Sequence, residues 1–459
     1  MEEQSRALLD EARAMYGAGS VAAALRLCGD VITRSVGEPD PVTVADAATI
    51  VRRPLDPATR AQAHRLAAHA LGLLLAAGLG DTPEARRVQA QLAATGDPFG
   101  APDTVTEPPP EPGAEFAALE ARVAELQNPL SAEDRIDLGS RAVALGQVAA
   151  RPEYQAWGHV WKLDAYASMG RRDALFRELA ALTILSRDLG PFWQAQLLLI
   201  RASQALIDGR LDVVVPLVED AASLTGKEGD AAFLHLPFAF EVARLAGAAA
   251  PLLPAVQAAV EQLPFVARVW LCVALKEAGQ RAQVVSEWRS LAPAVVETPP
   301  AASELLIVLV DAADLAVWLS DEASGTRLYD SLLPYAGLHA IPHACGPYQG
   351  PVDVALGRLA RLGGDRALAR GHLTAALEAS DQMHAMPARA AVLVELAALE
   401  PPASRRRVQL LDDASELAAQ LSLESAADQI TRLRPQRTAN RPLLTARETE
   451  VATLVARGL

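Results

Sequence analysis

The chain has 459 residues and a mass of 48.5 kDa, more than one compact core normally holds, so about two to four units or one long repeat array are expected. Hydrophobic residues make up 51% of the sequence but aromatic residues only 4%, which favours helices over a β-sandwich or barrel. The formal net charge of −14 disfavours a surface that coats nucleic acid or anionic membrane, so any DNA contact must come from a local element.

The first 95 residues carry the pattern of helical hairpins. Apolar residues recur at helical spacing over 3–36, with a break at the string YGAGS. A second unit over 42–95 contains a strongly apolar helix at 61–75, and Pro83 stands at the first-turn position of the next helix. We therefore expect an N-terminal region of helical hairpins over 1–95.

Residues 96–113 read GDPFGAPDTVTEPPPEPG and contain six prolines. Proline removes a backbone donor and clashes with the preceding helical turn, so this stretch cannot continue a helix. It predicts an extended, polyproline-type linker and the main boundary of the chain.

From 114 to 433 helical patterns resume with a recurring punctuation, a glycine next to Arg, Asp or Gln and then small residues. It occurs as MGRRDAL at 169–175, DGRLDVV at 208–214, AGQRAQV at 278–284 and GGDRALA at 363–369. The interval from Gly170 to Gly209 is 39 residues, and that from Gly209 to Gly279 is 70, or twice 35. Such periods are typical of helix-hairpin repeats.

The clearest unit begins at Leu356 and Gly357 and continues with small and large apolar residues. The remaining positions of this unit are Ala360, Ala369, Leu373 and Ala376. Their offsets resemble the tetratricopeptide pattern, although Asp353 stands where that pattern has Trp and Ala360 where it has Tyr. The resemblance implies an all-α, tetratricopeptide-like solenoid whose concave face binds a protein or a small molecule.

A Gly/Pro/His-rich loop interrupts this region and spaces His339, His343 and Cys345 as His-x-x-x-His-x-Cys. That spacing is geometrically possible for zinc or copper, but a fourth ligand is not evident nearby. Packing roles for the two histidines and a buried filler role for the cysteine are the simpler interpretation. We predict no metal site.

Catalytic and cofactor motifs are not recognisable in the sequence. Each lysine, at 162, 227 and 276, lacks the flanking residues of a phosphate-binding loop, and there is no Gly-x-Ser-x-Gly string. We therefore expect no enzymatic activity and no cofactor.

The three cysteines are far apart and odd in number, which fits reduced thiols, and no apolar run approaches the roughly 18 residues of a membrane helix. The chain starts Met-Glu-Glu without a basic leader region. These features predict a cytoplasmic protein without membrane contact.

The tail carries the sharpest signal. An Arg-rich linker over 434–443 precedes the segment 444–459, where Thr445 and Glu448 have the spacing of a capping box and Gly458 has that of a helix C-terminus. By its physics alone this is one more capped amphipathic helix.

The string LTARETEVATLVARGL, however, resembles the opening helix of the LuxR-type helix-turn-helix domain. The matching positions are Leu444, Thr445, Arg447, Glu448, Glu450, Val451, Leu454, Ala456, Gly458 and Leu459. The resemblance implies a DNA-binding domain, with Thr445, Arg447 and Glu448 among its residues. The sequence stops before the recognition helix of that domain, so we expect a truncated or incomplete form.

The order of parts also resembles the large LuxR-family regulators of actinobacteria, which usually carry an ATP-binding domain in front of their repeats. That module is absent from this sequence. The leading hypothesis is the sensor or interaction region of a LuxR-family transcriptional regulator, which contacts DNA only if the missing helices are present in the full gene product. The alternative is a tetratricopeptide-like interaction scaffold without DNA binding.

Overall fold

The computed structural model describes residues 2–37, 39–52, 54–97, 112–225, 230–300, 302–434 and 446–456. Helices account for 79% of the residues. In these ranges the strands are two antiparallel pieces of two residues, β1 (His339–Ala340) and β2 (Gly350–Pro351). The predicted all-α fold is therefore confirmed. None of the described helices is long and apolar enough to cross a bilayer.

Five helices form the N-terminal group. They are α1 (Glu2–Gly17), α2 (Val21–Arg34), α3 (Pro41–Thr49), α4 (Pro57–Ala76) and α5 (Pro83–Ala94). The side chains of Asp40, Asp56 and Thr82 each accept a hydrogen bond from the first turn of the following helix, which a proline begins in all three cases. Helix α5 begins at Pro83, the position that the sequence predicts for a helix start.

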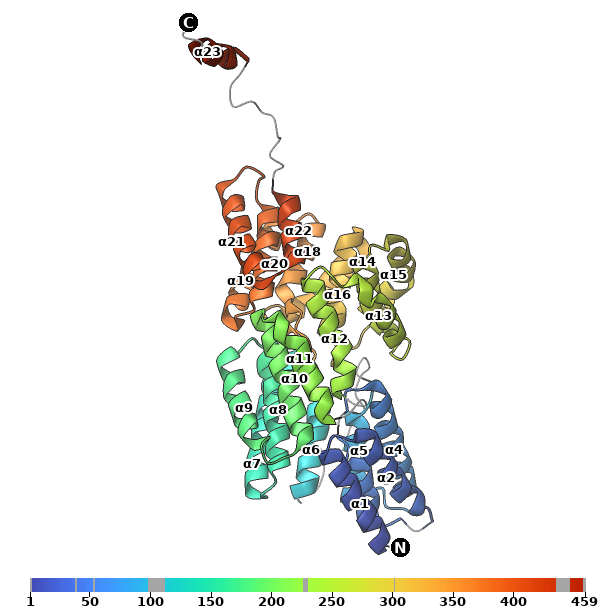
Figure 1. Ribbon diagram of the computed structural model, residues 1–459. Coiled ribbons are helices and arrows are strands. Elements are labelled where there is room, and N and C mark those ends of the chain that lie inside the picture. Colours follow the sequence, from blue (N-terminus) through green and yellow to red (C-terminus); the bar gives the residue numbers. More distant parts are fainter. Residues whose placement is uncertain are drawn as a thin grey trace.

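The helices that follow stack as antiparallel neighbours and form the repeat region (Figure 1). They are α6 (Pro112–Glu125), α7 (Ala132–Val148), α8 (Pro152–Ser168), α9 (Arg172–Leu185), α10 (Pro191–Asp208), α11 (Leu211–Thr225), α12 (Asp230–Leu245), α13 (Leu253–Val260), α14 (Arg268–Glu277), α15 (Arg281–Val296), α16 (Leu305–Leu319), α17 (Glu322–Leu332), α18 (Val352–Leu362), α19 (Arg366–Met383), α20 (Met386–Leu399), α21 (Arg405–Leu421) and α22 (Glu424–Leu433). A further helix, α23 (Ala446–Ala456), belongs to the tail.

The four glycine turns expected from the sequence lie between paired helices of this region. Gly170, Gly209, Gly279 and Gly364 have φ values of 67°, 80°, 71° and 83°. At each turn the next residue donates its N–H to a carbonyl in the last helical turn, for example Arg210 N to Ala205 O at 2.8 Å. Ser320 takes the same left-handed conformation between α16 and α17. The hairpin repeat is therefore confirmed at all four strings.

The tetratricopeptide-like unit is the hairpin of α18 and α19. Leu356 and Leu373 are fully buried, and a Cβ added at Gly357 would lie 2.7 Å from Leu373 Cγ. Asp353, at the position of the missing Trp, is also buried, and it accepts a hydrogen bond from Gly337 N at 2.6 Å. The glycine thus permits the close helix packing that the spacing predicts.

The N-terminal group continues into the repeat region by direct packing. Helix α5 packs on α6, where Ala90 contacts a cluster with Ala117 and Ala121. Of the predicted linker 96–113, residues 98–111 lie outside the described residues, and α6 already begins at Pro112. Most of the predicted Arg-rich linker 434–443 lies outside them as well.

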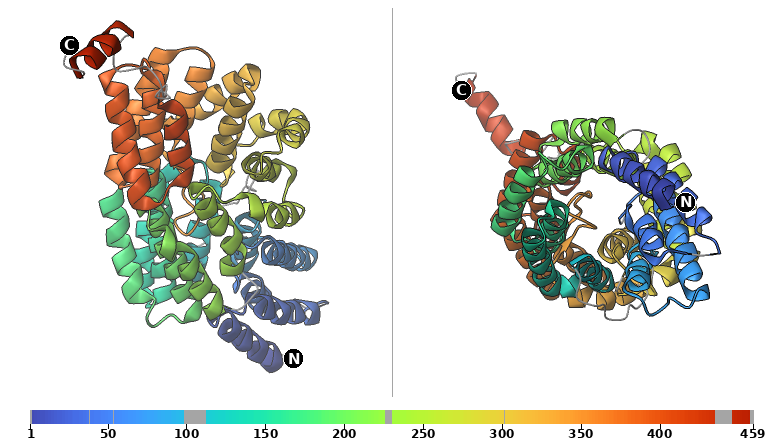
Figure 2. Two further views of the ribbon diagram at one scale, coloured as in Figure 1. Left: turned by 45° about the horizontal axis from the view of Figure 1, so that its top comes forward. Right: turned by 90° about the horizontal axis from the view of Figure 1, so that it is seen from below.

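The solenoid coils into a superhelix, which has the outline of a ring when it is seen end-on, from below the view of Figure 1 (Figure 2). Segments far apart in sequence meet where successive turns of the superhelix touch. Arg172 Nη1 donates to Met383 O at 2.9 Å across 211 residues, and Leu55 N donates to Asp230 Oδ1 at 2.6 Å across 175 residues. The superhelix therefore encloses an interior space.

Candidate functional site

The loop between α17 and α18 lies inside this ring (Figure 2). Its base is the β1–β2 pair, where Gln349 N donates to Ala340 O at 2.9 Å. Its tip is held to the inner wall because Ala344 N donates to Asp164 Oδ1 on α8 at 2.7 Å. The loop that interrupts the repeat therefore lines the interior of the superhelix.

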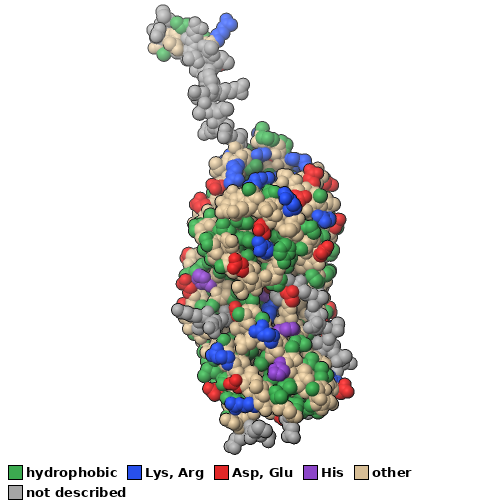
Figure 3. Space-filling view, turned by 90° about the vertical axis from the view of Figure 1, so that its right-hand side faces the viewer, with side chains coloured by type: hydrophobic (Ala, Val, Ile, Leu, Met, Phe, Trp, Pro, Cys, Tyr) green, Lys and Arg blue, Asp and Glu red, His purple; other side chains and the backbone are tan. Residues whose placement is uncertain are grey.

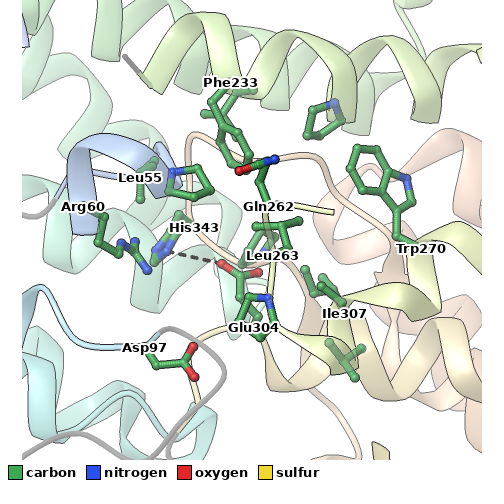
Figure 4. Close-up of a pocket in the computed structure, with 18 of the residues that line it drawn as sticks. Leu55, Arg60, Asp97, Phe233, Gln262, Leu263, Trp270, Glu304, Ile307 and His343 are labelled. Atoms are coloured by element: carbon green, nitrogen blue, oxygen red, sulfur yellow. Dashed lines mark ion pairs between the residues drawn. The ribbon is translucent and has the colours of Figure 1, made fainter. Parts of the chain in front are cut away.

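A cavity of about 540 Å³ lies between this loop tip and the helices α4, α12, α14 and α16 (Figure 4). Its middle is apolar, with Phe233, Leu263, Trp270 and Ile307 around it. The size falls within the range of pockets that hold small organic molecules.

One end of the cavity carries groups of both charges, namely Arg60, Glu304 and His343 (Figure 4). His343 Nε2 lies 3.9 Å from Glu304 Oε1, and its Nδ1 lies 3.6 Å from Asp164 Oδ2. Burial raises the pKa of Glu304, while electrostatic interactions with His343 and Arg60 oppose that rise. Acidic and basic side chains thus lie side by side at this end of the cavity.

A second polar part of the cavity carries two carboxylates. Asp311 on α16 and Glu241 on α12 both line the cavity. Burial, followed by the nearby charge of Glu241, raises the pKa of Asp311 to about 7. Arg244 is already engaged by Glu241, with Nη2 and Oε2 2.6 Å apart, whereas Asp311 receives a neutral hydrogen bond from Gln349 Nε2 at 3.3 Å.

The residues considered for metal binding do not converge. His339 is buried with its Nδ1 2.7 Å from the hydroxyl of Tyr348, and burial lowers its pKa to about 4. His343 faces the cavity, and burial raises the pKa of the Cys345 thiol. Across the described ranges, no three His, Cys, Asp or Glu residues are grouped to hold a metal ion.

The tail residues implied by the resemblance are separate from the cavity. Thr445 lies outside the described residues, and Arg447 and Glu448 are exposed on α23. Helix α23 also exposes Val451 (56%), Leu454 (44%) and Val455 (69%). Figure 3 shows α23 projecting beyond the body, whose basic and acidic side chains are interspersed on that face.

Sequence reasoning missed the acidic side chains of the cavity. Glu304, the N-cap residue of α16, and Asp311 lie seven residues apart, which places them on one side of the helix with Ile307 and Val308 between them. For Asp311 a signal was available, because it is one of two acids within the strongly apolar string LLIVLVDAADLAVWL. Glu241 could not be found in this way, because the fold brings it from α12.

Comparison with known proteins gives no family assignment. No protein-family model and no curated protein matches the chain. One solved structure, titled "Circular tandem repeat protein with novel repeat topology and enhanced subunit contact surfaces", aligns over 100% of both chains with 16% identity and a TM-score of 0.13. A TM-score this low supports no conclusion about function.

Proposed function

We propose that this chain is the sensor region of a LuxR-type transcriptional regulator that has no enzymatic activity of its own. The observation that carries the proposal is the string LTARETEVATLVARGL at the tail. In the family it resembles, this string is the first helix of the DNA-binding domain, and two helices that follow cover its apolar face.

The geometry of α23 supports this proposal. The helix spans Ala446–Ala456 within the resembling string, and Val451, Leu454 and Val455 are exposed. Exposed apolar residues at this spacing are what an opening helix would bury against its domain. The cavity inside the ring would be the place where the sensor region receives its signal.

The test is DNA binding by the gene product purified from its own host, with any residues that follow Leu459. We expect it to bind fragments of its own promoter region at physiological salt, with an affinity that falls as salt rises. Arg447→Ala should weaken binding. Arg26→Ala is the control, because Arg26 is equally charged and exposed but lies on α2. A gene product that binds no DNA under these conditions would refute the proposal.

The second candidate is an interaction scaffold without DNA binding. The mixed charge of the face in Figure 3 favours it, since a basic patch is the usual electrostatic footprint of a DNA-binding protein. Deletion of residues 435–459 separates the two functions. Loss of promoter control in the host supports the regulator, and unchanged control supports the scaffold.

A further inference from the structure

We propose that the cavity binds a small organic cation, a molecule with one ammonium group on a compact aromatic or alicyclic body. The ammonium group would lie against Asp311 and Glu241, and the body would fill the apolar middle. This assignment rests on the proposed sensor role of the cavity, but its test needs no DNA.

The charge distribution selects a cation. Asp311 makes no salt bridge within the described part of the chain, and its hydrogen bond from Gln349 is neutral. Arg244 attracts the charge of Asp311, but its hydrogen bonds go to another carboxylate. Arg244 donates to Glu241 from both Nε and Nη2, and Arg358 and Lys276 pair with Asp314. A partly buried carboxylate without a salt-bridge partner is destabilised, and a bound ammonium group would supply that partner.

Helix α12 carries a proline on the side that lines the cavity. Phe233, Pro237 and Glu241 recur every four residues along one face of α12, and all three line the cavity. Pro237 has no N–H, so it cannot donate the helical hydrogen bond that the carbonyl of Phe233 would otherwise receive. An ammonium group has three donors and no acceptor, which complements this arrangement.

The apolar middle selects the body of the ligand. Glu304 at the N-cap of α16 and Asp311 on that helix are seven residues apart, about 10 Å along the helix axis. Between them lie Ile307 and Val308, and Trp270 and Phe233 face the same space (Figure 4). Aromatic faces attract both apolar rings and cations, so an arylalkylamine fits better than a charged polar molecule such as a polyamine or a sugar phosphate.

Binding of an amine should also release protons from Asp311. Because Asp311 has a pKa of about 7 in the free protein, about half of the molecules carry a proton there at neutral pH. A bound ammonium group favours the ionised carboxylate, so binding at pH 7 releases protons to the buffer. Glu241, Arg244 and Asp314 also act on the charge of Asp311, and Gln349 contacts it.

The experiment is isothermal titration of the full chain with tryptamine, phenethylamine and amantadine, and with indoleacetate as an anionic match for tryptamine. We expect at least one amine to bind, and tryptamine to bind about tenfold or more tightly than indoleacetate. Titration at pH 7 in buffers of different ionisation enthalpy should show proton release. Absence of binding by all three amines, or equal binding of the two indoles, overturns the proposal.

Variants place the binding in this cavity. Asp311→Asn should lower the affinity for the amine about tenfold or more and abolish the proton release. Asp413→Asn, an exposed position on α21, is the matched control and should bind like the wild type. Ile307→Phe narrows the apolar middle and should weaken binding without removing the preference for a cation, which keeps the test available if Asp311→Asn does not fold. Wild-type affinity in both cavity variants would overturn the proposal.

The outcome is independent of the DNA-binding test. Amine binding together with a gene product that binds no DNA would refute the regulator and leave the ligand class in place. DNA binding by the gene product together with no binding of any amine would refute the ligand class and leave the regulator in place.

Discussion

The imidazole of His339, inside the ring, lies directly against Gly170 at the turn between α8 and α9, in the space that a Cβ at position 170 would occupy. Gly170 also has a φ of 67°, which side chains with a Cβ rarely adopt. The absence of a side chain at Gly170 thus permits both the left-handed turn between α8 and α9 and the close approach of His339 from the internal loop.

Gly170→Ala should therefore destabilise the protein by about 2 to 4 kcal/mol, the sum of backbone strain and displacement of a buried ring. Gly279→Ala is a matched control, because Gly279 has a φ of 71° at an equivalent turn but no atom within 4 Å of its added Cβ. Gly279→Ala should lower the free energy of unfolding by only about 1 to 2 kcal/mol. Urea unfolding measures both variants, and equal losses would mean that the His339 contact contributes nothing.

The α18–α19 hairpin should depend on Leu373. This side chain is fully buried against Gly357, so Leu373→Ala should cost about 2 to 5 kcal/mol through lost burial and the cavity left behind. Leu368, on the same helix, is 42% exposed, and Leu368→Ala should cost less than about 1 kcal/mol. Thermal unfolding followed by circular dichroism compares them. Similar shifts in Tm for the two variants would contradict the observed packing.

The stability of the free protein should depend on pH through Asp311. Its folded pKa of about 7 lies above the ordinary value of 3.8, so the folded state holds a proton that the unfolded state releases. Stability from this group is fully present below about pH 4 and is lost as the pH rises through 7, by up to about 1.4 kcal/mol for each pH unit. Asp311→Asn should remove this dependence and raise the Tm at pH 8 while leaving it unchanged near pH 4. A variant with the wild-type pH profile of Tm would contradict the assignment.

Arg358 should stabilise the protein through its ion pairs with Asp314 and Glu395, behind the cavity. It donates to Glu395 Oε1 at 2.7 Å and lies 3.4 Å from Asp314 Oδ1, so it connects α16 to α20. Although burial itself raises the pKa of Asp314, Lys276 and Arg358 together hold that pKa down to about 2. Arg358→Ala would remove one of two positive partners from each carboxylate, because Lys276 still pairs with Asp314 and Arg361 with Glu395, and it should cost about 1 to 3 kcal/mol. Arg26→Ala, at an exposed position, should leave the free energy of unfolding within about 0.5 kcal/mol of the wild type, and a similarly small loss at Arg358 would contradict the network.

Much of the local architecture could be predicted from the sequence. The turns at Gly170 and Gly364 were found from short strings, because a left-handed residue after a helix favours glycine, although Ser320 takes that conformation without it. The close packing of Gly357 on Leu373 followed from the spacing of small and large residues on two neighbouring helices. These features depend only on residues near in sequence.

The candidate site was predicted much less well. His343 was identified, but as a possible metal ligand, and the structure places it beside Glu304 at one end of a cavity. Asp311 was not identified although it lies within the apolar string of α16, and Glu241 looks like an ordinary polar residue within its own helix. The tail prediction rests on resemblance, and Thr445 lies outside the described residues.

The sequence by itself determined the helical hairpins, their caps and their turns, because these depend on hydrogen bonds and packing within about 40 residues. Only the tertiary structure decided that the solenoid coils around an interior space, that the loop before α18 lies inside it, and that Asp311 and Glu241 line the same cavity there. Those relationships arise from small rotations between successive hairpins, which add up over contacts as distant as the 211 residues between Arg172 and Met383. A local pattern of residues does not determine the total rotation along the chain.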